Sequence, residues 1–199
     1  MKSKGRMDRI ILASQSEVRK KILNDNDILC EVVPSKLNEE PVKKKLIMSK
    51  TNPEKIAEKL ASLKAKKISD KFINRLVLGA DSLINLEGEL ISKPNNRIEA
   101  LNILKRLNGK VHYLISSVSI YKNGEEIWNY TDKASLTMKN FTDQELESYL
   151  SRIDDKELYA YNVYQIEGEG RYLFQKIEGD ENTIMGLPVN KIKEYIKTI

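Results

Sequence analysis

Asp81 is the residue whose surroundings in this sequence most suggest chemistry. It follows the apolar run Leu76 to Leu78 and the small pair Gly79–Ala80, so its carboxylate is expected at the end of a buried strand, over an open sheet edge. A carboxylate in that place can bind a hard cation or accept a proton. It can equally cap the strand, and Asp81 by itself does not decide between these roles.

Three cations could complete a site for an anionic ligand. Arg19 lies three residues beyond Ser16, near the expected start of a helix whose free amides can bind an anion. Lys64 lies at the border of the apolar stripe of a later helix, and Lys93 precedes Pro94, which holds the backbone extended. Residues of these types are more often solvated at the surface. Taken singly, the three positions leave both interpretations open.

The remaining polar candidates carry weaker signals. Glu39 and Glu40 are expected in a polar loop after Pro34, where plain solvent exposure is the alternative. His112 lies on an alternating strand, where a structural role is the more common one. Because it is the single histidine, a histidine-based metal cluster is excluded. The patterns GxSxG, GxxxxGK[ST] and GxGxxG do not occur in the sequence.

The elements that must position these residues alternate between helices and strands. Strands are expected over residues 9–13, 28–33, 76–80, 111–121 and 126–138, helices after Ser16, from Pro53, over 97–108, from Thr142 and from Pro188, and an extended segment over 164–177. Asn123–Gly124 between two of the strands is a strong hairpin signal. The pattern therefore predicts an α/β fold with a mixed sheet.

The composition is that of an ordinary globular protein. With 199 residues, 40% hydrophobic and 32% charged, the chain can form one sizeable domain or two intimate lobes around a real core. No apolar run approaches the ~20 residues that span a bilayer, and the basic start of the sequence lacks the apolar segment of a signal peptide. Cys30 is the single cysteine, so no internal disulfide can form, and a reducing compartment, the cytoplasm, is expected.

The net charge of +5 raises the alternative of a protein that binds RNA or DNA and does no chemistry. However, the 34 basic residues are interleaved with 29 acidic ones, and the densest basic runs, Lys43–Lys45 and Lys64–Lys67, are short. The chain has one tryptophan and no ladder of alternating aromatic and basic residues. Small polyphosphates satisfy a preference for anionic partners as well as nucleic acid does.

Seven short segments, spaced over nearly the whole chain, carry a stronger signal than any single residue. They are LASQSEVRKKIL (12–23), LASLKAKKI (60–68), LGADSLI (78–84), SKP (92–94), NGKVH (108–112), YQIEGEG (164–170) and GDENTIMGLPV (179–189). In this order and spacing they resemble the Maf family of nucleotide pyrophosphatases. The matching family elements include the LASxSPRRxxLL opening, the GAD[TS] strand end and the closing Yx[IL][QE]G and GD…xGLP segments.

The resemblance implies one Maf-like domain over residues 1–199. Its fold would be α/β, of the two-lobed Maf and ITPase-like kind, with a mixed β-sheet flanked by helices and a central cleft. The implied enzyme hydrolyses the bond between the α- and β-phosphates of a nucleoside triphosphate, giving monophosphate and diphosphate, with Mg²⁺ or Mn²⁺ as cofactor. A cytoplasmic homodimer without nucleic-acid or membrane partners completes the expectation.

Carried over residue by residue, the resemblance assigns a role to each matching position. Asp81 would be the catalytic residue, and Asp81 and Glu39 the metal ligands. The substrate-binding residues would be Ser14, Arg19, Lys64, Lys93 and Glu167. The residue types fit, because cations can neutralise a triphosphate and the leaving pyrophosphate, and carboxylates are hard ligands for Mg²⁺ or Mn²⁺. Which carboxylate binds the metal and which handles the proton stays open.

Three departures from the family pattern bear on activity. Glu17 and Val18 replace the family's Pro and first Arg, so phosphate binding by this loop rests on Arg19. Ala160 to Val163 replace the small-residue segment KAG[AS], which changes the demands on the local backbone. Glu167 stands where much of the family has Gln.

Glu167 leads to a hypothesis about the base. A glutamine amide both donates and accepts, which suits a pyrimidine, whereas a carboxylate only accepts, and guanine offers N1–H and an exocyclic amine. The positive charge of 7-methylguanine would strengthen that pairing, and Glu here also resembles the branch associated with 7-methyl-GTP. The expected substrate is therefore 7-methyl-GTP. The alternatives are a dTTP/UTP pyrophosphatase of the same family and a catalytically weak Maf-fold protein acting in cell division.

Overall fold

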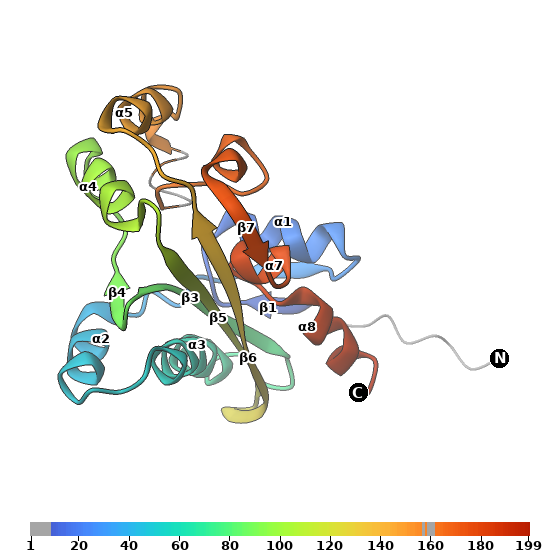
Figure 1. The fold of residues 1–199 in the computed structure, drawn as a ribbon. Coiled ribbons are helices and arrows are strands. Elements are labelled where there is room, and N and C mark those ends of the chain that lie inside the picture. Colours follow the sequence, from blue (N-terminus) through green and yellow to red (C-terminus); the bar gives the residue numbers. More distant parts are fainter. Residues whose placement is uncertain (1–8, 157, 159–161) are drawn as a thin grey trace. The chain divides into compact units, whose positions relative to one another are not determined.

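A mixed β-sheet connects most elements of this α/β chain. The computed structural model describes residues 9–156, 158 and 162–199 (Figure 1). In chain order its elements are β1 (Ile10–Leu12), α1 (Glu17–Asp25), β2 (Cys30–Val32), α2 (Glu39–Met48), α3 (Pro53–Ser69), β3 (Val77–Leu86), β4 (Glu89–Ile91), α4 (Arg97–Leu107), β5 (Val111–Lys122), β6 (Glu125–Met138), α5 (Asp143–Ser151), the 3₁₀ turn η1 (Glu169–Leu173), β7 (Phe174–Glu178), α7 (Glu181–Ile184) and α8 (Val189–Ile196). None of these described helices is both long and apolar enough to cross a membrane.

The pairing of the strands confirms the predicted mixed sheet. Within the described residues the sheet has seven strands in the order β2-β1-β3-β5-β6-β7, and β4 pairs with β3. β1 pairs in parallel with both β2 and β3, whereas the β3–β4 and β6–β7 pairs are antiparallel. Parallel neighbours require crossover connections, which α1 and the α2–α3 segment provide.

Two compact units divide the chain. The first unit contains Met1–Asp81, Ser117–Thr131 and Val189–Ile199, and the second contains Ser82–Ser116 and Asp132–Pro188. Three strands, β3, β5 and β6, pass from one unit to the other. Asp81 is the last residue of the first unit before β3 enters the second.

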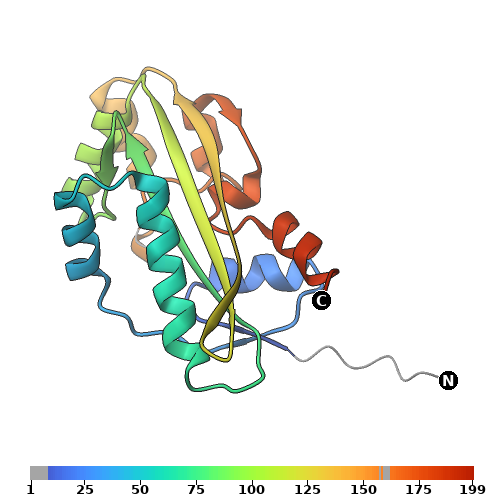
Figure 2. The same cartoon turned by 90° about the horizontal axis from the view of Figure 1, so that it is seen from below.

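Helix α3 supplies one side of the core of the first unit. The buried residues of α3 are Ile56, Ala57, Leu60, Ala61, Lys64, Ala65, Ile68 and Ser69. Ala65 and Ile68 pack against Ile11 of β1, Val77 of β3 and Tyr121 of β5. Figure 2 shows α3, in teal, running along these strands toward the β5–β6 hairpin. Because one face of α3 is apolar and continuous, the helix lies flat on the sheet.

Gly79 allows this close approach, and replacing it should be costly. A Cβ atom added at Gly79 would meet the carbonyl of Ala61, and it would lie 2.7 Å from the amide nitrogen of Ala65, both in the backbone of α3. We expect Gly79→Ala to lower the free energy of unfolding by about 3 kcal/mol, which corresponds to roughly 6–12 °C in Tm. Gly168→Ala is the matched control, since its Cβ would meet only atoms at 3.7 Å or beyond. Equal Tm values for the two variants would contradict the packing argument.

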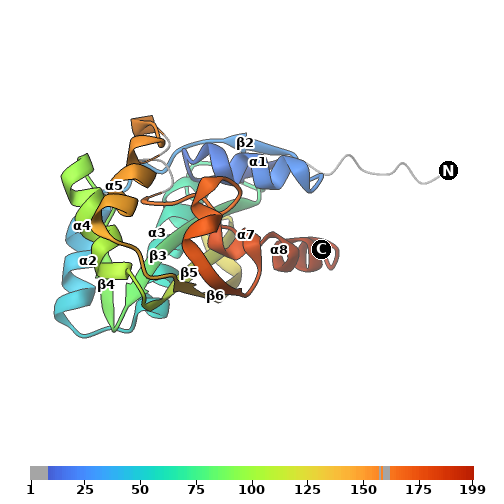
Figure 3. The same cartoon turned by 45° about the horizontal axis from the view of Figure 1, so that its top comes forward.

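Helices α4 and α5 lie side by side in the second unit (Figures 1 and 3). Their apolar faces meet the strands in a core that includes Leu104, Leu107, Leu136, Met138, Leu146 and Leu150. Arg97, the first residue of α4, donates hydrogen bonds of 2.7 Å to the carbonyl oxygens of Leu150 and Ile153. These bonds tie the first residue of α4 to carbonyl oxygens at and just beyond the end of α5, and they therefore hold the two helices together.

The local sequence signals are confirmed where the chain itself forces a conformation. Asn123 and Gly124 have φ values of 54° and 79°, as the hairpin signal requires, and Gly109 ends α4 at φ 69°. Thr142 and Glu145 form the predicted capping box at the start of α5.

Three predictions about elements are wrong. Glu39 and Glu40 form the first turn of helix α2 and do not lie in a loop. Asp81 lies within a ten-residue strand, because the buried side chains that follow it extend β3 to Leu86. Residues 164–177 are extended only from Phe174 onward. Turns and η1 precede it, where Gly170 approaches the backbone of Gln165 too closely for any side chain.

Candidate active site

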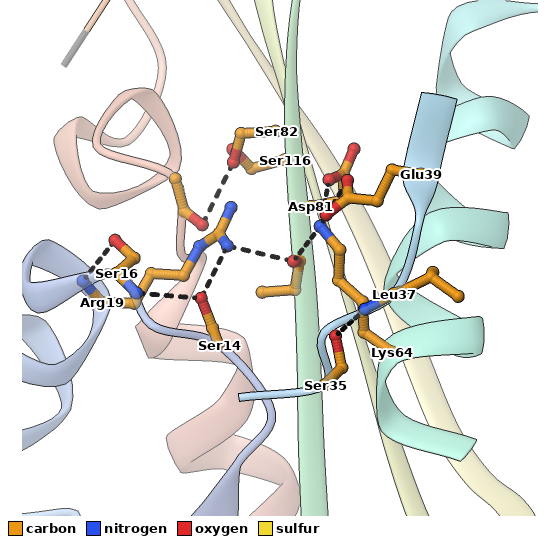
Figure 4. Close-up of polar contacts among 12 residues, drawn as sticks. Ser14, Ser16, Arg19, Ser35, Leu37, Glu39, Lys64, Asp81, Ser82 and Ser116 are labelled. Atoms are coloured by element: carbon orange, nitrogen blue, oxygen red, sulfur yellow. Dashed lines mark hydrogen bonds and ion pairs between the residues drawn. The ribbon is translucent and has the colours of Figure 1, made fainter. Parts of the chain in front are cut away.

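The start of α1 holds the guanidinium of Arg19 in the first unit. Ser16 caps α1 and accepts a hydrogen bond from the backbone N–H of Arg19 at 3.4 Å. The Ser14 hydroxyl accepts from the backbone N–H of Ser16 and from Arg19 Nη1, both at 3.2 Å. Arg19 Nη1 also donates to the carbonyl oxygen of Ala80 on β3 at 3.0 Å. The guanidinium therefore reaches from the helix start to β3 (Figure 4).

Lys64 approaches the same stretch of β3 from the opposite side. Figure 4 shows α1 and α3 on either side of β3, with Lys64 extending from α3. Its side chain is only 9% exposed, and its ammonium lies 2.7 Å from Asp81 Oδ1 and 2.9 Å from Glu39 Oε2. The Ala80 carbonyl oxygen is a third, more distant acceptor at 3.5 Å. An ammonium has three N–H donors, so these acceptors compensate the cost of burying its charge.

Asp81 is the buried carboxylate of this group. It is 5% exposed, and Oδ1 accepts the hydrogen bond from Lys64. Its other oxygen, Oδ2, is buried and has no hydrogen-bond partner among the residues that the structure describes. Burial raises the pKa of Asp81, and the nearby charges of Lys64 and Arg19 oppose that shift. The result is a carboxylate with increased proton affinity and one buried oxygen that has no partner among the described residues.

Glu39 is the more accessible carboxylate. It is the first residue of α2, and its side chain is 42% exposed while it contacts Lys64. A negative charge at a helix N-terminus is favoured by the helix dipole. None of the residues Glu39–Met48, all of which the structure describes, is fully buried. Few tertiary contacts therefore hold this carboxylate in place, compared with Asp81.

Two cations thus face two carboxylates within the first unit. Burial lowers the pKa of Arg19, and Asp81 and Glu39 oppose that shift, so the guanidinium remains a cation at neutral pH. The residues that the structure brings together are Ser14, Arg19, Glu39, Lys64 and Asp81. Lys93 and Glu167 lie in the second unit, Lys93 exposed between β4 and α4 and Glu167 exposed in a turn before η1.

Comparison with known proteins identifies the family. The sequence pattern described as Maf-like protein matches residues 9–199. This chain belongs to the Maf family. A nucleoside triphosphate pyrophosphatase of Pelagibacter ubique is 67% identical over 96% of this chain and 97% of its own. A 7-methyl-GTP pyrophosphatase of Rhizobium etli is 35% identical over 91% of each chain. Among solved structures, the Ham1 protein of Staphylococcus aureus covers 95% of this chain and 98% of its own, with 13% identity and a TM-score of 0.46.

One departure from the Maf pattern has a structural explanation. Asn162 stands in place of the family glycine in KAG[AS], and its φ of 70° lies in the left-handed region that glycine favours. Asparagine tolerates this region better than most other residues, so the backbone at Asn162 can keep a glycine-like conformation. Ala160 and Tyr161 lie outside the described residues.

The oxygen atoms of this Maf site suit a divalent cation. Asp81 Oδ2 and the Glu39 carboxylate are hard donors within one cluster, and the first is a buried atom that lacks a partner among the described residues. The described residues contain no group of three or more potential metal-binding side chains. A site with two carboxylates matches Mg²⁺, which commonly uses one or two carboxylates together with substrate phosphates.

The Ala80 carbonyl is a member of the site that sequence analysis missed. It accepts hydrogen bonds from both Arg19 and Lys64, whose positions lie 61 and 16 residues away. A backbone carbonyl leaves no signal in residue types. The resemblance to GAD[TS] pointed to the correct segment of this chain, but it gave no indication that the Ala80 carbonyl oxygen accepts hydrogen bonds there.

His112 anchors the segment that carries Glu167. It is fully buried in β5, and its Nε2 lies 2.7 Å from the hydroxyl of Tyr164, which begins the YQIEGEG segment. Its ring also lies against that of Phe174, with 5.8 Å between centroids. These contacts agree with the structural role expected for His112.

Burial of His112 should make this Maf protein sensitive to acid. Burial lowers the pKa of His112 from 6.5 to about 4, so the folded state holds the ring neutral while the unfolded chain protonates it. The stabilisation is therefore complete above pH 6.5 and is lost as the pH falls toward 4, by about 1.4 kcal/mol per pH unit. In urea unfolding, the free energy of unfolding should fall by about 2 kcal/mol between pH 7 and pH 5 because of this group. The His112→Phe variant should lack this component, and an unchanged pH dependence in it would refute the assignment.

Proposed function

We propose that this chain hydrolyses nucleoside triphosphates to nucleoside monophosphate and pyrophosphate at the cluster of Arg19, Glu39, Lys64 and Asp81. The observation that carries the proposal is the buried ammonium of Lys64 between the carboxylates of Asp81 and Glu39. In a purely structural ion pair, both oxygens of a buried carboxylate usually have hydrogen-bond partners. Asp81 Oδ2 is buried without a partner among the described residues, which instead favours a site where an ion or a water binds. The 67% identical relative carries the name of the same activity.

In the proposed reaction, the cations bind phosphate and the carboxylate Asp81 handles the attacking water. Arg19 and Lys64 neutralise the triphosphate and the charge that develops on the pyrophosphate as it leaves. Asp81 orients a water molecule and takes its proton while the water oxygen bonds to the α-phosphorus and the bond to the bridging oxygen breaks. A raised pKa makes Asp81 a better proton acceptor than an ordinary aspartate. Ser14 holds the Arg19 guanidinium in position.

Asp81 and Glu39 would hold a divalent cation, Mg²⁺ or Mn²⁺. When bound, the cation supplies Lewis acidity, which stabilises phosphate charge and lowers the pKa of a coordinated water. The family resemblance further implies that Lys93 and Glu167 bind the same substrate and that the protein is a homodimer. Both stay predictions, and sedimentation of the purified chain tests the second.

Pyrophosphate release by the purified chain tests the proposed activity. The substrates are dTTP, UTP, CTP, GTP and 7-methyl-GTP, each with Mg²⁺, with Mn²⁺ and with a chelator. We expect release that requires the cation. If no triphosphate is cleaved under any condition, the result favours the alternative that this chain is a catalytically inactive relative. DNA or RNA binding that collapses with salt and needs no cation would favour the nucleic-acid alternative.

The proposal extends to the base, for which we infer a preference for 7-methyl-GTP. Glu167 is exposed in its turn and can therefore meet a ligand. Its carboxylate matches the two adjacent donors of guanine and the positive charge of the methylated ring. The 35% identical relative bears the 7-methyl-GTP name, while the 67% identical one bears the general name.

Glu167→Gln should change the base preference. The amide replaces one acceptor by a donor, so we expect kcat/KM for 7-methyl-GTP to fall by about 10–100-fold and that for UTP to stay equal or rise. Glu178→Gln, another exposed carboxylate of the second unit, is the control and should change neither. Equal losses on both substrates would assign Glu167 a role other than base selection.

A further inference from the structure

Two lysines of α3 contact the segment that leads into α2. Lys64 Nζ lies 2.9 Å from Glu39 Oε2, and Lys67 Nζ donates a hydrogen bond of 2.8 Å to the backbone carbonyl oxygen of Lys36. Lys64 and Lys67 are three positions apart on one helix, so their side chains leave the same face of α3. That face therefore holds the segment at both of its ends, Lys36 and Glu39, and all four residues belong to the first unit.

The backbone at Lys36 adopts a conformation that lysine disfavours. Its φ of 48° lies in the left-handed region, where a residue with a Cβ atom is strained. Such a conformation persists only where surrounding contacts hold it. On one side of Lys36, the hydroxyl of the buried Ser35 accepts a hydrogen bond from the backbone N–H of Leu37 at 3.4 Å (Figure 4). On the other side, Lys67 binds the Lys36 carbonyl, so the two bonds together maintain the turn.

Helix α2 provides little to fix Glu39 by itself. Asn38 occupies the position before the helix, but its side chain makes no capping hydrogen bond to the described start of α2. No residue from Glu39 to Met48, a stretch that the structure describes completely, is fully buried. A helix is normally anchored by the burial of an apolar face. The direction of the turn at Lys36 therefore has a large influence on where the Glu39 carboxylate lies.

We propose that Lys67 is a positioning residue, whose hydrogen bond to the Lys36 carbonyl holds the left-handed turn that presents Glu39 to Lys64 and to a divalent cation. The inference rests on the proposed function, in which Glu39 is a ligand of that cation. It extends this function to a lysine for which the family resemblance gives no role. Lys67 acts through the backbone and contacts neither the substrate nor the cation.

Cation affinity is the first measurement. Mn²⁺ is titrated into the full-length chain together with the non-cleavable analogue α,β-methylene-GTP, and EPR follows the free Mn²⁺. Lys67→Met removes the donor, Lys67→Arg keeps one, and Lys66→Met changes an exposed neighbour on α3. We expect the Kd for Mn²⁺ to rise about 3–10-fold in Lys67→Met and less than about twofold in the other two variants. At saturating Mn²⁺, kcat should stay within about twofold of wild type.

Coupling to Glu39 distinguishes positioning from a general loss of stability. In the Glu39→Gln background, Lys67→Met should raise the Kd no further, because the carboxylate that Lys67 positions is already gone. With Lys36→Gly, the effect of Lys67→Met should shrink, since glycine adopts the left-handed turn without support. A wild-type Kd in Lys67→Met, or the same increase in the Glu39→Gln background, overturns the proposal. A loss of kcat at unchanged Kd overturns it as well.

Amide hydrogen exchange separates failure of this inference from failure of the proposed activity, because it needs neither substrate nor cation. We expect peptides that cover residues 36–45 to exchange about fivefold faster in Lys67→Met and at the wild-type rate in Lys66→Met. If the wild type binds no Mn²⁺, the cation site fails, whereas faster exchange confined to this segment still supports the hold of Lys67 on the turn. Unchanged exchange in Lys67→Met rejects that hold, whatever the activity.

Discussion

Asp81→Asn should lower kcat for pyrophosphate release by about 10³-fold or more. Asparagine fills the same volume on β3 and can still contact Lys64, but it cannot accept the water proton and is a much weaker ligand for a divalent cation. Pyrophosphate release at saturating substrate measures the effect. Asp25→Asn, an exposed carboxylate of the same unit, is the control and should retain full activity.

The pH profile provides an independent check on Asp81. The proposed role requires the ionised carboxylate, and burial raises its pKa, so activity should fall with acid at a higher pH than an ordinary aspartate would give. This acid limb should be absent from the residual activity of Asp81→Asn. A variant with wild-type turnover and an unchanged acid limb would move the catalytic role to another residue.

Lys64→Met should have the second-largest effect, on both catalysis and stability. It removes the cation that Asp81 and Glu39 share, so the phosphate loses a positive neighbour and the two carboxylates are left with their mutual repulsion. We expect kcat/KM to fall about 10²–10³-fold and the free energy of unfolding to fall by about 3 kcal/mol. The pH optimum should move upward, because the ammonium of Lys64 opposes the burial that raises the pKa of Asp81, and that opposition is lost in Lys64→Met.

Two comparisons make the Lys64 prediction specific. Lys59→Met, on the exposed side of α3, should leave both activity and stability unchanged. Lys64→Arg keeps the charge but should rescue poorly, because a planar guanidinium is larger than an ammonium and cannot point donors at the same three acceptors. If Lys64→Met loses stability but keeps kcat/KM, Lys64 is a structural ion pair and not part of the site.

Local sequence signals determined much of the fold. Asn123–Gly124 specified the hairpin because its two positive φ values are accessible to asparagine and glycine. Ser16 and the Thr142–Glu145 box specified helix starts because their side chains satisfy amides within three residues. The seven ordered segments likewise identified the family and the residue types of the candidate site, because both are properties of the linear sequence.

Where a prediction depended on distant contacts, the sequence was insufficient. The polar stretch after Pro34 predicts a loop at Glu39, where the structure has the first turn of α2. The apolar run followed by Gly79–Ala80 predicts a strand end at Asp81, where β3 continues to Leu86. Lysine is a residue type usually found at the surface, yet the packing of α3 on β3 buries Lys64. Its burial could not be inferred without that packing.

The sequence by itself thus determined which charged residues this Maf protein has at the family's motif positions and in what order they occur. Only the tertiary structure decided that the Ala80 carbonyl joins Arg19 to Lys64, that Asp81 has a buried oxygen with no partner among the described residues, and that Asn162 lines a cavity. The physical reason is distance along the chain. Burial and hydrogen-bond partners depend on residues tens of positions apart, and only the folded sheet and its helices bring those residues together.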